Sequence, residues 1–318
     1  MTGAGLGRVH CVLPDELVKV ADLPELALLG QEEQEFALGS GVRTVGVFPD
    51  GPATAPAADA CRALEVERAD VLLLVSPRAP DVLLGSDVGR VQHESSIKAG
   101  LSFTVDGLGC TGSSAAWGLA ADLLAADPSR DTVVIAHASR PTGVDRVRYP
   151  VTVIGDGAYA MTVVRGGRPL LRAHRARSDG EFHDLFTVDY KQVPAYEWRE
   201  ECTSPDRYKF ELAMRSRLEL GALVDEVLAD AGVSRDAVAA TVMQNVTASA
   251  FQFYESLLGL PIHPVCAEHL ATYGHLGAMD VVLNLDRLLA SGDVSAGDLV
   301  LVLNNSPVAA WAVTLWEV

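Results

Sequence analysis

The most informative segment of the sequence is Asp106-Gly107-Leu108-Gly109-Cys110-Thr111-Gly112-Ser113-Ser114-Ala115-Ala116-Trp117-Gly118-Leu119. The run at 101–105 before it predicts a short buried strand, and the small residues at 114–126 after it predict a helix. Cys110 therefore lies at a tight turn from a strand into a helix, with glycines on both sides.

This turn gives the Cys110 thiol the surroundings of a nucleophile. Glycines let a substrate approach the backbone closely. The positive end of the helix and its free N–H groups stabilise a thiolate and bind a developing oxyanion. A buried structural cysteine is the alternative, and this segment alone leaves both interpretations open.

Composition bounds the class of protein. The chain has 318 residues, 49% of them hydrophobic and 21% charged, which indicates one large or two similar globular domains. No apolar run is long enough to span a membrane, and the first five residues lack the features of a signal peptide. The five cysteines are widely spread without a CxxC pair, so neither a zinc site nor a disulfide framework is indicated. We therefore expect a reduced, cytoplasmic setting and no metal or other cofactor.

The formal net charge of −17 argues against a nucleic-acid or membrane partner. An acidic partner would need a local basic patch, for which the arginines at 140–148 and at 165–177 are candidates. An ordinary solvated surface is the interpretation that we favour for both groups.

Strand and helix patterns alternate along both halves of the chain, which predicts a duplicated α/β unit of layered sheets and helices. Strands are expected at 44–48, 70–75, 132–137, 238–243, 298–303 and 309–316, and two short ones within 151–164. Helices are expected at 57–64, 114–126, 213–231, 248–258 and 279–289. The polar, irregular segment from about 178 to 208 is expected to cap an active site.

Several motifs in this order resemble the ketoacyl synthase III branch of the thiolase-fold superfamily. They are Gly41-Val42-Arg43, the Cys110 turn, Ile154-Gly155-Asp156-Gly157-Ala158, Arg177-Ser178-Asp179-Gly180, Tyr273-Gly274-His275-Leu276-Gly277-Ala278, and the segment from Gly297 to Trp311. The resemblance implies an α/β thiolase fold, in which two duplicated βαβαβαββ halves form five αβαβα layers. The halves would be residues 1–165, with the nucleophile Cys110, and residues 166–318, with the capping loop. It also favours Cys110 as the nucleophile.

The chain departs from the family's Cys-His-Asn set, in which the His and Asn steer decarboxylation of a malonyl thioester. Gln244 stands at the position of that His, and His275 stands at the position of that Asn. The amide of Gln244 cannot accept a proton at neutral pH, but it can donate hydrogen bonds to a carbonyl. His275 can act as a base, or it is a loop histidine with a backbone partner.

Two further departures concern the oxyanion hole and the donor. Pro307, which has no N–H, falls on or next to the position of the family's second oxyanion donor, so Ser306 or Val308 would have to supply it. Glu35 and Gly39 replace the Trp and Arg of the family's coenzyme A site. An acyl carrier protein is therefore the favoured donor, with acyl-CoA as the alternative.

The resemblance and the departures together leave three hypotheses. The favoured one is an acyltransferase of bacterial natural-product or antibiotic biosynthesis, expected to be a homodimer. In it Cys110 is acylated, and His275 then activates a hydroxyl or amine of a small-molecule acceptor without acting in the loading step. The second is a condensing enzyme that makes a β-ketoacyl product, with Gln244 and His275 stabilising the enolate. The third is a non-catalytic subunit of a heterodimer.

Overall fold

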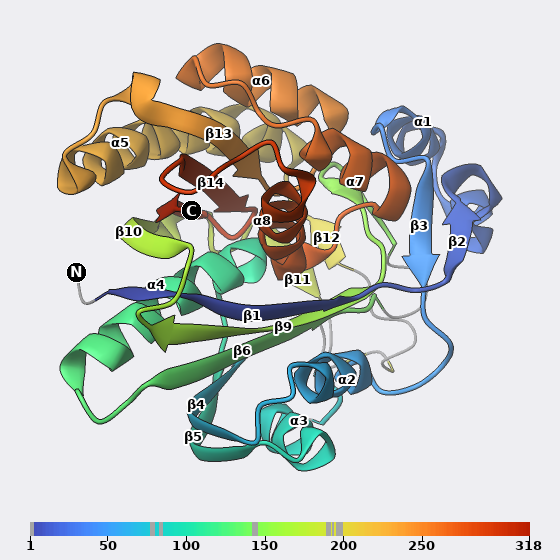
Figure 1. The fold of residues 1–318 in the computed structure, drawn as a ribbon. Helices are drawn as coiled ribbons and strands as arrows, with labels where there is room; N and C mark the ends of the chain where they lie inside the picture. Colours follow the sequence, from blue (N-terminus) through green and yellow to red (C-terminus); the bar gives the residue numbers. More distant parts are fainter. Residues whose placement is uncertain are drawn as a thin grey trace.

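The computed structural model describes residues 3–76, 80–82, 85–141, 146–188, 192, 194 and 200–318. Its main feature is a nine-stranded sheet in the order β13-β14-β15-β10-β1-β9-β6-β4-β5 (Figure 1). The strands from the first half of the chain are β1 (Ala4–Val12), β4 (Arg68–Val75), β5 (Lys98–Val105), β6 (Thr132–Ser139) and β9 (Gly157–Arg165). Those from the second half are β10 (Leu170–Ser178), β13 (Val238–Met243), β14 (Leu299–Ser306) and β15 (Ala310–Glu317).

The two halves of this sheet repeat one pattern of strand pairing. β1, β9 and β6 pair antiparallel in turn, then β4 and β5 follow in parallel. β10, β15 and β14 pair antiparallel in the same way, and β13 follows in parallel. A parallel bridge from Thr241 to Ile262 stands where β5 stands in the first half. The halves join where Gly5 of β1 pairs with Leu170 of β10.

Helices lie on both sides of each half-sheet (Figure 1). α2 (Ala55–Ala63) and α3 (Asp87–Ser95) cover one outer face, and α5 (Ala213–Ala231) and α6 (Ala248–Leu258) cover the other. α4 (Gly112–Ala126) and α8 (Asp280–Ser291) lie between the half-sheets. The five αβαβα layers of the thiolase fold are confirmed. That residues 1–165 and 166–318 are separate domains stays a prediction.

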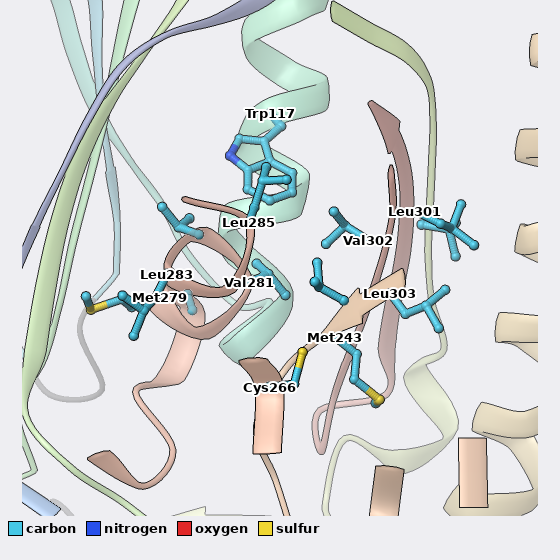
Figure 2. Close-up of a cluster of buried hydrophobic side chains, with 14 of the residues drawn as sticks. Trp117, Met243, Cys266, Met279, Val281, Leu283, Leu285, Leu301, Val302 and Leu303 are labelled. Atoms are coloured by element: carbon cyan, nitrogen blue, oxygen red, sulfur yellow. The ribbon is translucent and has the colours of Figure 1, made fainter. Parts of the chain in front are cut away.

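The central layer is the most apolar part of the molecule because it is covered by a sheet on each side. Trp117 of α4, Leu285 of α8 and Val302 of β14 pack there with almost no exposed surface (Figure 2). The strands beside this layer, such as β4 and β14, are nearly continuous apolar runs, as expected for strands buried on both faces. This core fixes the ends of α4 and α8, from which two site residues come.

Several smaller elements complete the described fold. They are α1 (Gln31–Gly39), β2 (Glu16–Lys19), β3 (Thr44–Val47), β7 (Val147–Arg148), β8 (Thr152–Val153), β11 (Phe186–Val188), β12 (Glu200–Cys202), α7 (Val265–Tyr273) and the 3-10 turns η3 (Gly109–Thr111) and η8 (Gly277–Met279). Among the described helices, none has both the length and the apolar character needed to cross a bilayer.

Two predictions about these elements were wrong in part. The strand at 101–105 is an edge strand rather than a buried one, and Leu101 is 54% exposed because β5 has a sheet neighbour only on its β4 side. The segment at 178–208 is not wholly irregular, since β11 and β12 pair antiparallel within it. Its residues 189–191, 193 and 195–199, and residues 142–145 of the first arginine group, lie outside the described residues.

Candidate active site

Cys110 lies in the η3 turn that leads into α4 and is 6% exposed. Gly109 has a φ of +52°, and a Cβ there would lie 2.4 Å from Ser306 Oγ at the end of β14. The positive φ favours glycine here, and any other residue would also displace the Ser306 side chain. The Asn304 amide donates to the Cys110 carbonyl (3.0 Å) and to Ser114 Oγ (3.1 Å), which fixes the turn against β14.

His275 is held beside the thiol by backbone bonds on both of its sides. Its N–H donates to the Val153 carbonyl (2.9 Å), and its carbonyl accepts from the Gly155 N–H (3.0 Å). Gly274, with a φ of +73°, makes the turn out of α7 that this position requires. The Nε2 atom of His275 then lies 3.0 Å from Cys110 Sγ, and the side chain is 2% exposed.

Asp280, the first residue of α8, orients His275. Its Oδ2 lies 2.6 Å from His275 Nδ1, and its carboxylate also accepts from the backbone N–H groups of Leu276 and Asn245, each at 2.8 Å. A carboxylate held by three donors is an acceptor, so Nδ1 of His275 carries a proton and Nε2 faces the thiol. Cys110, His275 and Asp280 thus form a hydrogen-bonded series. Asp280 was not identified from the sequence.

Electrostatics favour an ion pair between the first two groups. Burial would raise the pKa of the Cys110 thiol, but the His275 imidazolium, its hydrogen bond and the Arg148 guanidinium together lower it. Burial would lower the pKa of His275, but the Cys110 thiolate and the Asp280 carboxylate outweigh burial and raise it to about 10. His275 therefore shifts Cys110 toward the thiolate, the form that attacks thioesters.

Arg148 belongs to this site rather than to a solvated surface, so that prediction was wrong for it. Its side chain is 11% exposed, and its Nε and Nη2 donate to Glu200 of β12. The guanidinium also lies 5.0 Å from the centre of the Phe186 ring. The hairpin of β11 and β12 covers Arg148, and a buried charge needs such a partner.

The second arginine group, at 165–177, fits the ordinary surface that we favoured. Its ion pairs are Arg165 with Asp131, Arg168 and Arg172 with Glu317, Arg175 with Asp230, and Arg177 with Glu219 and Glu226. Carboxylates thus balance this patch.

Gln244 is 1% exposed at the end of β13, and within the described part of the chain neither atom of its amide has a hydrogen-bond partner. The next residue is well held, since Asn245 Oδ1 accepts from Asn284 at 2.8 Å. Among the described residues, Gln244 is not one of those that line the cavities beside Cys110. The structure therefore joins Cys110 and His275 but does not bring Gln244 into contact with them.

Two cavities meet at Cys110 and His275. The first has a volume of about 400 Å³ and is mainly apolar, with Phe36, Pro150, Leu212, Phe253, Tyr254 and Pro307 in its wall. The second has a volume of about 250 Å³, and its wall includes His137, Ser139, Arg148 and Glu200. A nucleophile between two cavities can receive one group on each side. The described residues contain no cluster of three or more His, Cys, Asp or Glu that could hold a metal ion.

The last turn of the chain, between β14 and β15, lies against the nucleophile. Pro307 lines the first cavity, and the Ala309 N–H is taken by the Ser306 carbonyl at 3.0 Å. The Val308 N–H makes only a long contact of 3.5 Å with Ser306 Oγ. Of the two expected substitutes for the missing donor, Val308 therefore has an N–H that is weakly held.

Known proteins resemble the chain over nearly its whole length. Residues 228–318 match the family described as 3-oxoacyl-[acyl-carrier-protein (ACP)] synthase III C terminal. A beta-ketoacyl-[acyl-carrier-protein] synthase III of Alkalilimnicola ehrlichii is 26% identical over 302 residues, which cover 91% of each protein.

Two solved structures show the same fold. ChlB3, named as an acyltransferase, is 24% identical with a TM-score of 0.83, and the match covers 99% of this chain and 97% of ChlB3. The 3-oxoacyl-(acyl carrier protein) synthase III of Pseudomonas aeruginosa PAO1 is 18% identical with a TM-score of 0.78, and the match covers 99% and 98%.

Proposed function

We propose that this chain, which is similar to ketoacyl synthase III proteins and shares their fold, is an acyltransferase that moves an acyl group to a small hydroxyl or amine acceptor. The observation that carries the proposal is the His275 imidazole, which lies 3.0 Å from Cys110 Sγ and 2.6 Å from Asp280. This series supplies a nucleophile and a base at one point.

In the loading step, the Cys110 thiolate attacks the carbonyl carbon of the donor thioester. The tetrahedral intermediate expels the donor's thiolate, which takes the proton from His275 Nε2. Cys110 now carries the acyl group, the donor leaves as a thiol, and His275 is neutral. His275 thus acts in loading too, because its imidazolium keeps Cys110 ionised.

In the transfer step, His275 is the base toward the acceptor. Of the groups that raise the pKa of His275, the Cys110 thiolate has the largest effect, so thioester formation removes that effect and lowers the pKa of His275. Neutral Nε2 takes the proton of the acceptor hydroxyl or amine while that group attacks the acyl carbonyl. Collapse expels the Cys110 thiolate and restores the ion pair. Asp280 keeps the other proton on Nδ1 throughout.

Condensation is the second candidate, and one observation favours it. The buried Gln244 amide has no partner in the described part of the structure and so has free donors, although it does not line either cavity beside Cys110. A neutral amide stabilises such charge less than a charged donor does, so we expect no useful decarboxylation of a malonyl thioester.

The deciding experiment measures two quantities: the mass of the intact protein, which reports the bound acyl group, and the carbon dioxide released from a malonyl donor. The protein should gain an acyl mass from an acyl-carrier donor, and Cys110→Ala should abolish this gain while circular dichroism stays unchanged. An adduct on the variant would remove Cys110 from its role. Absence of any adduct on the wild type would favour the non-catalytic subunit. Carbon dioxide release from a malonyl donor at the rate of acyl transfer would favour the condensing enzyme.

Two features of the surface support proposals about the partners of this protein. An acyl carrier protein is the favoured donor because an exposed apolar stripe lies beside the first cavity, formed by Phe210, Met214 and Leu218. A homodimer is proposed because the exposed edge strand β5 offers unpaired backbone groups. A role in antibiotic biosynthesis and a cytoplasmic location stay predictions.

A further inference from the structure

The second cavity beside Cys110 has a polar wall that the acyl-transfer chemistry does not use. His137 of β6 is part of this wall and is 3% exposed. Its Nδ1 lies 3.1 Å from the Val75 carbonyl, which can only accept, so Nδ1 carries the proton. The other ring nitrogen, Nε2, is therefore a bare acceptor.

Within the described residues, no group donates to His137 Nε2, although the Leu276 backbone also interacts with this ring. Burial lowers the pKa of His137 to about 4, so the ring stays neutral and Nε2 stays an acceptor at physiological pH. A Cβ on Gly277 would lie 3.3 Å from Nε2, so a glycine keeps space open beside it.

The other polar groups of the wall are already engaged. Ser139 Oγ donates to the Gly155 carbonyl at 3.1 Å. Arg148 pairs with Glu200 and His275 with Asp280, and Asp106 adds a carboxylate, so the described wall offers no unpaired positive charge for an acyl carboxylate. A buried acceptor without a donor destabilises the site, and a ligand that brings a donor removes this destabilisation.

We propose that the second cavity selects the acyl group, and that it takes a short, neutral acyl chain whose hydroxyl donates to His137 Nε2. The inference rests on the proposed acyl transfer, since it names the substrate of the same thiol. The volume of about 250 Å³ suits a short chain. A plain alkyl chain of the same length would bury Nε2 without a partner.

Competition between matched donors tests the selection. Cys110 should be loaded about tenfold faster, or more, from the N-acetylcysteamine thioester of 3-hydroxybutyrate than from that of butyrate, with intact mass as the readout. Equal rates would overturn the proposal. Faster loading from a malonyl thioester would overturn it as well, because that chain carries a charge.

Two variants distinguish the role of His137 Nε2 as a hydrogen-bond acceptor from the structural role of the side chain. In His137→Asn the amide keeps a donor toward the Val75 carbonyl but ends short of Nε2, so the rate ratio should fall to about one. In His137→Gln the amide oxygen reaches toward the position of Nε2, and part of the ratio should return. A ratio unchanged in His137→Asn would show that His137 does not select.

A binding measurement distinguishes the proposal of acyl transfer from the proposal that the second cavity selects the acyl group. The amide analogue of the 3-hydroxybutyryl donor cannot transfer its acyl group, and it should shift the ¹⁵N resonance of His137 Nε2 where the butyryl amide does not. This shift without any loading of Cys110 would refute acyl transfer and support the cavity assignment. Loading with no preference, or no shift with either amide, would refute the cavity assignment and leave acyl transfer standing.

Discussion

His275 sets the charge of Cys110, and this makes a pH-dependent prediction. The pKa of Cys110 is lowered from its ordinary 9.0, so the thiolate persists below pH 9.0. In His275→Gln the imidazolium is gone and burial raises the pKa. Alkylation of Cys110 by iodoacetamide at pH 6 should then fall about a hundredfold, and its midpoint should move upward.

Two controls accompany this measurement. Peptide mapping restricts the rate to Cys110, and Cys110→Ala gives the background. Asp280→Asn should keep much of the alkylation but slow acyl transfer by about a hundredfold, because the tautomer of His275 is lost. An unchanged midpoint in His275→Gln would contradict the ion pair.

Gln244 offers a second test, because its amide has no partner to lose. Gln244→Met should leave the free energy of unfolding unchanged or raise it by about 1 kcal/mol. Single-turnover acyl transfer should also stay within about twofold of the wild type, because Gln244 does not line either cavity beside Cys110. Urea denaturation and rapid-quench loading provide the two readouts.

Asn284→Leu is the contrasting control for Gln244. The Asn284 amide of the wild type donates to the Met243 carbonyl at 2.7 Å and to Asn245 Oδ1 at 2.8 Å. Asn284→Leu should therefore lose about 1–3 kcal/mol of stability. Equal losses in both variants would give Gln244 a structural role instead.

Some residues of the site could be predicted from sequence patterns and others could not. Cys110 and His275 stand in local motifs, so their positions could be predicted. Asp280 follows His275 by five residues, and its orientation depends on the η8 turn and on Asn245, which follows β13. Arg148 was placed on the surface because its partner Glu200 is 52 residues away.

The turn that leads from α7 to His275 depends on Gly274, which gives a prediction about the end of this helix. Gly274 has φ +73° and ψ −160°, and a Cβ there would lie 2.8 Å from the Val153 carbonyl. Gly274→Ala should lose about 3 kcal/mol of stability and displace His275. The midpoint of Cys110 alkylation should then rise.

Gly292→Ala is the matched control, since Gly292 has a φ of +85° at the end of α8 but no atom within 4 Å of an added Cβ. It should lose about 1 kcal/mol and leave the alkylation midpoint unchanged. If both glycine variants shift the midpoint equally, the turn does not position His275 specifically.

Elements were predictable where their ends are encoded locally. α5 and α6 match the predicted bounds because Gly232 and Gly259 end them in left-handed conformations and Thr247 caps the start of α6. The strands β1 and β10 were not predicted, since charged and apolar residues are mixed along them. The exposure of β5 follows from its place in the sheet, which local patterns do not contain.

At the scale of the whole molecule, alternation of strands and helices in two halves predicted the duplicated architecture, and colinear motifs predicted the thiolase fold. The cavities could not be predicted in this way. Each is assembled from both halves, so its shape and polarity depend on side chains far apart in the sequence.

The net charge of −17 and the exposed stripe of Phe210, Met214 and Leu218 bear on the donor together. Because this negative charge gives little general attraction for an acidic partner, binding of a carrier protein would depend on local apolar contact.

Met214→Glu combined with Leu218→Glu should raise KM for a carrier-bound donor about tenfold or more. Loading from the N-acetylcysteamine thioester, which needs no docking, should stay unchanged. Equal effects on both donors would place the damage in the site itself, and no effect on either would move the docking surface elsewhere or favour coenzyme A.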